Sequence, residues 1–138
     1  MRKTIAIIFL CCVSGICADA ETNPLLGTWS AVSPATTAGP ASVLYLTFRG
    51  DWSYEMRALV GTNAAGTGSG MAITDGNYEL TGPNSINYWE TRYQICPSGG
   101  YCADYPSPVG DFGKKKPGTF ELVGDKQMKA EGLLWTRQ

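Results

Sequence analysis

The segments 43–49 and 52–60 alternate between apolar and polar side chains, and this alternation constrains the fold more than any other feature. A period of two is the period of a β-strand, whose successive side chains point to opposite faces of a sheet. Between the two segments lies Gly50-Asp51, a typical tight-turn pair. The sequence therefore predicts a β-hairpin here, and helical spacing fits neither segment.

Similar runs recur along the chain, at the spacing of about 8–12 residues that is typical of all-β barrels and sandwiches. Turn residues separate them at Asp75-Gly76 and at 81–84, and the segments 61–70 and 96–118 have the composition of loops. We predict eight strands, at 25–32, 43–49, 52–60, 71–74, 77–81, 85–95, 119–123 and 127–136. Eight antiparallel strands close into a barrel whose interior holds side chains or one small ligand. The predicted fold is therefore all-β, an eight-stranded antiparallel up-and-down barrel.

The two ends of the predicted barrel carry complementary residues. Gly27-Thr28-Trp29 lies in the first predicted strand, and Arg137 is one residue from the end of the chain. The first and last strands of a closed barrel are neighbours, so Arg137 is expected to lie across the indole face of Trp29. Such a cation–π contact contributes roughly 0.5–1 kcal/mol when exposed and about 2 kcal/mol when desolvated. We predict that Gly27, Trp29 and Arg137 form the structural closure.

Residues 1–20 have the organisation of a secretory signal peptide. Arg2 and Lys3 precede an apolar run at 5–16, and Ala18-Asp19-Ala20 offers a cleavage site. The apolar run is too short to span a bilayer, which needs about 20 residues. We therefore predict a signal peptide at 1–20, a β-barrel domain at 21–138, and export to the periplasm or the medium.

A lipoprotein anchored through Cys17 is the alternative, although Ile16 stands where lipoprotein signals usually have a small residue.

Cys96 and Cys102 are the cysteines that remain after cleavage, and a pair in an exported protein predicts a disulfide. Closing so short a ring stabilises the fold by roughly 2–3 kcal/mol. A redox-active pair is less favoured because the usual redox motif separates its cysteines by two residues rather than five.

The chain has no histidine, which excludes Ser-His-Asp and Cys-His catalysis and removes the commonest metal ligand. Its net charge of −1 gives no sign of nucleic-acid binding. We predict no metal, no cofactor and no enzymatic activity, and no transmembrane segment in the mature chain. Glu90 and Arg92 lie two residues apart on one predicted strand, and they form either a polar pair inside the barrel or charges on its outside.

Several short motifs together resemble the lipocalin-like (calycin-type) small β-barrels. They are Leu26-Gly27-Thr28-Trp29, the segments 46–54, 76–80 and 119–125, and the terminal Arg137. The resemblance implies a barrel with a lumen open to a small ligand. Two departures are that the chain is shorter than typical lipocalins and that no helix is predicted beside the last strand. The entry motif is also similar to that of avidin-like barrels, but the matching biotin contacts are absent.

The leading functional prediction is a non-enzymatic protein that holds a small apolar ligand in the barrel lumen. The candidate lining residues are Trp52, Tyr54, Met56, Trp89 and Tyr93, with Phe48 and Phe120 deeper. The alternative is a protein-binding module, for example an inhibitor of an exported hydrolase. It would act through Tyr101, Tyr105 and Phe112 of the 96–118 loop, because aromatic side chains often anchor partners.

Overall fold

The structure is a computed structural model that describes residues 23–37, 40–61 and 70–138. The predicted signal peptide at 1–20, with Cys17, and most of the predicted loop at 61–70 lie outside these residues. The strands are β1 (Gly27–Ser33), β2 (Ser42–Phe48), β3 (Ser53–Val60), β4 (Gly70–Gly82), β5 (Ser85–Pro97), β6 (Ala103–Asp104), β7 (Lys116–Thr119), β8 (Glu121–Val123), β9 (Gln127–Ala130) and β10 (Leu133–Arg137). The described residues contain no helix, and the prediction of an all-β fold is confirmed.

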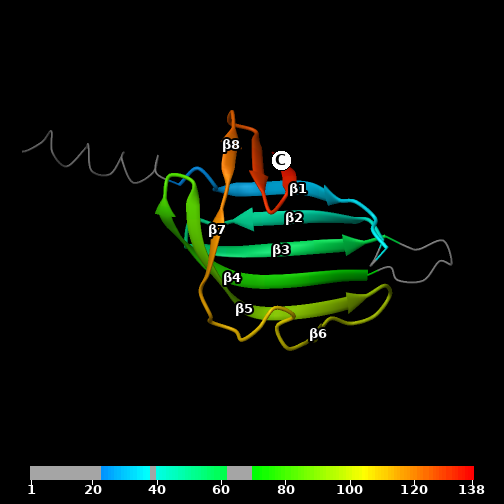
Figure 1. Cartoon of the computed structure of the whole chain (residues 1–138). Helices are drawn as coiled ribbons and strands as arrows, with labels where there is room; N and C mark the ends of the chain where they lie inside the picture. Colours follow the sequence, from blue (N-terminus) through cyan, green and yellow to red (C-terminus); the bar gives the residue numbers. More distant parts are fainter. Residues whose placement is uncertain (1–22, 38–39, 62–69) are drawn as a thin grey trace, which may run out of the picture.

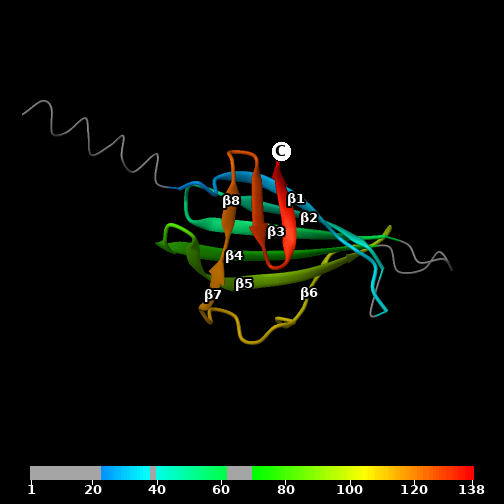
Figure 2. The same cartoon turned by 45° about the horizontal axis from the view of Figure 1, so that its top comes forward.

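All strand pairs are antiparallel and belong to one sheet of ten strands. Its order is β6-β5-β4-β3-β2-β1-β10-β9-β8, with β7 off this path and paired with β5. Strands β1 to β5 lie side by side, and β7, β8 and β9 run across them (Figures 1 and 2). The sheet is not closed into a barrel, and it has ten strands where the sequence predicts eight.

The predicted turn at Asp75-Gly76 is wrong, because both residues lie within the long strand β4. Gly76 pairs with Tyr54 on β3, and a Cβ atom on Gly76 would lie 2.5 Å from Cε1 of the Tyr54 ring. Glycine is therefore required here by the close approach of an aromatic ring and not by a turn. This one error divides a single strand into two predicted strands.

The C-terminal strands also divide differently from the prediction. The predicted strand 127–136 is interrupted by Glu131 and Gly132, both with positive φ (51° and 72°), which make the turn between β9 and β10. The predicted strand 119–123 is interrupted at Phe120, which alone separates β7 from β8. As a result, the segment 116–123 pairs with β5 at its beginning and with β9 at its end.

Aromatic side chains form most of the core, and they come from strands β1 to β4 and from the C-terminal segment 120–135. Trp29 is fully buried, and its indole N–H donates a 2.7 Å hydrogen bond to the carbonyl of Leu25. Phe48 and Tyr78 pack edge to face with their ring centroids 4.8 Å apart. The buried cluster comprises Leu25, Trp29, Ala31, Phe48, Tyr54, Tyr78, Phe120, Met128 and Trp135. Because Phe120, Met128 and Trp135 come from the C-terminal segment, the core joins that segment to the strands β1 to β4.

Strands β1 and β10 are neighbours, with Trp29 paired to Arg137 and Ser30 to Thr136. The Arg137 guanidinium lies over the Trp29 indole ring, where the sequence places it. Gly27 stands at the start of β1 with a φ of 111°, a backbone conformation that favours glycine. The three residues therefore lie together at the junction of the first and last strands.

Candidate functional site

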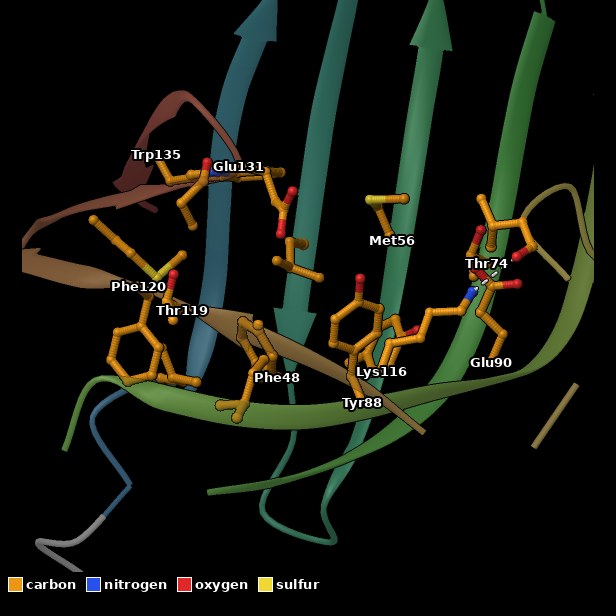
Figure 3. A pocket seen from close by; sticks show the side chains of 18 residues that line it. Phe48, Met56, Thr74, Tyr88, Glu90, Lys116, Thr119, Phe120, Glu131 and Trp135 are labelled. Atoms are coloured by element: carbon orange, nitrogen blue, oxygen red, sulfur yellow. Dashed lines mark hydrogen bonds between the residues drawn. The ribbon is translucent and has the colours of Figure 1, made fainter. Parts of the chain in front are cut away.

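A cavity of about 440 Å³ lies between the sheet and the C-terminal segment that crosses it (Figure 3). Strands β2 to β5 provide one apolar wall, with Leu46, Phe48, Tyr54, Met56, Ile86 and Tyr88. The opposite wall contains Leu25, Phe120, Met128, Ala130 and Trp135. The lining is therefore largely apolar and aromatic, with a small number of polar groups, as in known ligand sites.

Strand register explains why these side chains meet. Phe48 pairs with Tyr54 across β2 and β3, and Leu46 pairs with Met56, which in turn pairs with Thr74. Directly paired residues of adjacent strands point to the same face of a sheet. The alternation that predicts the hairpin thus also places one row of side chains toward the cavity.

Glu90 is the buried acidic residue of this site, with 9% of its surface exposed. Its Oε2 accepts a 2.6 Å hydrogen bond from the hydroxyl of Ser107, and no ion pair to it is formed among the described residues. Its main-chain carbonyl accepts a hydrogen bond from the Gly113 N–H at 2.8 Å. Glu90 therefore holds the loop 105–115 at two points while its side chain lines the cavity.

Tyr54 and Tyr88 stand beside Glu90 on the sheet wall. Their ring centroids are 6.4 Å apart in an edge-to-face arrangement. Burial is the main cause that raises the pKa of the Tyr54 hydroxyl above its ordinary value, and the negative charge of Glu90 adds to it. Burial also raises the pKa of Tyr88, with the charges of Glu131 and Glu90 as further causes. Both phenols are therefore neutral hydrogen-bonding groups at physiological pH.

Lys116 and Glu131 are the other charged residues of the lining. The ammonium group of Lys116 donates a 3.4 Å hydrogen bond to the carbonyl of Val109 in the loop 105–115. Glu131 occupies the β9–β10 turn, on the side of the cavity away from Glu90 in Figure 3. Two carboxylates and one ammonium group thus give the lining a formal charge of −1.

The structure brings four of the sequence-predicted lumen residues into this lining: Phe48, Tyr54, Met56 and Phe120. Trp52, Trp89 and Tyr93 do not line it. Trp52 has a φ of 65° in the β2–β3 turn, is 44% exposed, and packs against Tyr78 with ring centroids 5.4 Å apart. The strand prediction starts one residue too early there, because Trp52 belongs to the turn.

A bulge in β5 places Trp89 and Tyr93, which the sequence predicts on one face, on opposite faces: Tyr93 pairs with Thr74 of the lining, whereas Trp89 pairs with Asn77. Asp75 pairs with Arg92 and Gly76 pairs with Glu90, so Thr91 is an extra residue in β5. A bulge of one residue reverses which face the following side chains take. Trp89 pairs with Asn77 on the face away from the cavity, where the Lys115 ammonium lies 4.8 Å from its ring centroid.

The same bulge decides between the two alternatives for Glu90 and Arg92. Glu90 lines the cavity, whereas the Arg92 side chain forms a 3.0 Å ion pair with Asp104. The two are not paired with each other, and neither alternative describes both residues. Sequence reasoning gave no role to Ile86, Tyr88 or Trp135, although Ile86 and Tyr88 are the apolar members of the other predicted face of strand 85–95.

The predicted disulfide between Cys96 and Cys102 is confirmed. Of the aromatic residues of the alternative prediction, Tyr101 lies inside the disulfide ring, and Tyr105 and Phe112 lie in the loop that follows it. Tyr101 is 97% exposed, and Tyr105 and Phe112 are about half exposed, at 47% and 43%. These three side chains do not line the cavity, although Val109 of the same loop does.

Within the described segments, no group of three or more acidic, cysteine or histidine residues is placed to hold a metal ion. No helix in the described part of the chain is long and apolar enough to cross a membrane. Comparison of the chain with known protein families, with characterised proteins and with solved structures found no match in any of the three.

Proposed function

We propose that this protein is a non-enzymatic binding protein that holds one small, mostly apolar molecule in the cavity. The observation that carries the proposal is the cavity itself, about 440 Å³ in volume with apolar walls on two sides. Known small-molecule sites have volumes of about 300–1,000 Å³ and a similar lining.

The proposal includes a barrel-like, lipocalin-type enclosure around the molecule. In the sheet order β5-β4-β3-β2-β1-β10-β9, the segment 116–123 pairs with the two outer strands, β5 and β9. This pairing supports an enclosure, because it links the two ends of the row of strands. Export is the second part of the proposal. The Cys96–Cys102 disulfide supports it, since disulfides persist in oxidising compartments.

Titration with N-phenyl-1-naphthylamine, an apolar dye whose fluorescence rises in apolar surroundings, tests the proposal. We expect saturable binding of one dye molecule per chain. Met56→Trp should weaken dye binding by at least about tenfold, because the larger side chain fills the space between the walls. Val43→Trp is the matched control, since Val43 is exposed and does not line the cavity.

Retained folding of both variants is checked by circular dichroism. The proposal fails if the wild-type protein does not bind the dye, or if the two tryptophan variants affect binding equally. A third variant, Ala130→Phe, fills the cavity from the opposite wall and provides the same test should Met56→Trp not fold.

The exposure of Tyr101 favours a second candidate function, that of a protein-binding module acting through the loop after Cys96. An almost fully exposed tyrosine on a disulfide-fixed loop is suited to contact a partner. Native mass spectrometry of protein purified from its own host separates the two functions. Under this second function a protein partner co-purifies and is lost in Tyr101→Ala, whereas Met56→Trp has no effect on it.

A further inference from the structure

Among the residues that the structure describes, no cationic group lies within ion-pair distance of the Glu90 carboxylate. Its side chain lines the cavity, its one side-chain hydrogen bond comes from Ser107 to Oε2, and no described residue donates a hydrogen bond to Oε1. Nine-tenths of Glu90 is buried, so its carboxylate has lost part of the water that solvated it, which is costly unless a cation or a hydrogen-bond donor replaces that water. A ligand group that donates hydrogen bonds and carries positive charge would offset this cost.

Two aromatic rings stand on the same wall as this carboxylate. Tyr54 is paired with Gly76, and Gly76 is paired with Glu90, so Tyr54 and Glu90 lie on one row of the sheet. Tyr88 is two residues before Glu90 and packs edge to face against Tyr54. Faces of tyrosine rings attract cations, by roughly 0.5–1 kcal/mol when exposed and about 2 kcal/mol when desolvated.

The net charge of the lining also favours a cation. Glu90 and Glu131 outnumber Lys116, and Lys116 is not within ion-pair distance of either carboxylate in the described structure. The Lys116 ammonium is held instead by the Val109 carbonyl. Lys116 opposes an added cation, but the two carboxylates leave a net negative potential in a cavity with low-dielectric walls, where such potentials are strengthened.

We infer that the ligand of the cavity is an apolar amine, whose ammonium group is bound by Glu90 beside the Tyr54 and Tyr88 rings while its hydrocarbon part contacts Met56 and Phe120. This inference rests on the proposed function, because it names the chemical class that the same cavity selects. Glu90 is then the residue that determines specificity, and the apolar walls supply most of the contact area.

Competition among three ligands of equal chain length tests the inference. Octylammonium, 1-octanol and octanoate are each titrated against protein saturated with N-phenyl-1-naphthylamine at pH 7, and displacement of the dye gives their affinities. We expect octylammonium to bind about tenfold more tightly than 1-octanol, a difference of about 1.4 kcal/mol, with octanoate the weakest.

Variants then assign the preference to a residue. Glu90→Gln keeps the shape and the acceptor for Ser107, and it should remove the preference for octylammonium over 1-octanol. Lys116→Gln should strengthen octylammonium binding about two- to threefold, because a like charge is removed. Glu79→Gln is the control, since Glu79 pairs with Lys115 and is not part of the lining.

Equal affinities for the three ligands, or tighter binding of octanoate, would overturn the inference while dye binding still supports the proposed function. Failure of the dye itself to bind would instead reject the proposed function. Persistence of the octylammonium preference in Glu90→Gln would also overturn the assignment. Should Glu90→Gln not fold, the order of the three ligands on the wild-type protein decides.

Discussion

The guanidinium of Arg137 lies 4.4 Å from the centroid of the Trp29 indole ring, while its Nη2 donates a 2.6 Å hydrogen bond to the carbonyl of Pro24. Trp29 and Arg137 are also directly opposite each other in the pairing of β1 with β10. The Nε of Arg137 is buried without a hydrogen-bond partner in the described structure, so part of the stabilisation is offset. The contact joins strands from the two ends of the domain.

Replacing these two residues should reveal their coupling. Trp29→Ala removes a fully buried aromatic side chain and should lower the free energy of unfolding by about 3–5 kcal/mol. Arg137→Ala should cost about 1–2 kcal/mol. The double variant should lose less than the sum of the two, because the contact is broken by either change. Urea denaturation measures all four values, and additive losses would show that the contact contributes nothing to stability.

Gly76→Ala should destabilise the protein by more than about 1–3 kcal/mol, the usual cost of overpacking. The added methyl group would overlap the Tyr54 ring and the main-chain carbonyl of Trp89, and the carbonyl cannot move without breaking the ladder of β4 and β5. Gly50→Ala is the matched control, because a Cβ on Gly50 meets nothing within 4 Å. Thermal denaturation compares the two variants, and equal melting temperatures would disprove the packing argument.

Removing the disulfide should lower stability without changing the sheet. The ring closed by Cys96 and Cys102 is short, so the chain-entropy argument gives a loss of about 2 kcal/mol in the double variant Cys96→Ser, Cys102→Ser. The comparison is made by urea denaturation, with the reduced wild-type protein as the control.

Mass mapping of exported, unreduced protein should also find the N-terminus at Glu21, and a lipid-modified Cys17 would contradict the predicted signal peptide.

Stability should fall as the pH rises above about 10. Burial raises the pKa of Tyr54, Tyr78 and Tyr88 above the ordinary value of 10.0. In the unfolded chain these phenols lose their protons near that pH, whereas in the folded protein they keep them, so deprotonation favours unfolding. The free energy of unfolding from urea titrations between pH 8 and about 11 measures the effect.

Tyr54→Phe should reduce the slope of stability against pH above 10, because it removes one of the three phenols whose pKa burial raises. Tyr101→Phe is the control, since Tyr101 is almost fully exposed. An unchanged slope in Tyr54→Phe would show that the Tyr54 hydroxyl is not shielded from water.

The sequence was sufficient to predict features that depend on local pattern. The hairpin of β2 and β3 follows from strict alternation around Gly50, and the same alternation placed Tyr54 and Met56 on the face that borders the cavity. The disulfide followed from the number of cysteines left after the predicted cleavage. The hairpin needs only neighbouring residues, and the disulfide needs only a count of cysteines.

The features that the sequence did not predict depend on residues far apart in the chain. Gly76 has the composition of a turn, and only the Tyr54 ring packed over it shows why it lies within a strand. The bulge at Thr91 is set by the pairing of β5 with β4, and one extra residue puts Trp89 and Tyr93, expected on one face, on opposite faces. Ser107 likewise meets Glu90 only through the path of the loop 105–115.

The pairing of Trp29 with Arg137 also bears on how the protein is made. Hairpins of β1 to β5 can form while synthesis continues, since their partners are close in sequence, but the free edge of β1 receives its neighbour only when β10 has been added. Phe120, Met128 and Trp135, which complete the cavity, also follow β5 in the chain. We therefore expect a chain that stops before residue 120 to keep strands β1 to β5 and to lack the wall of the cavity that Phe120, Met128 and Trp135 provide, so that the proposed ligand binding requires the segment 120–135.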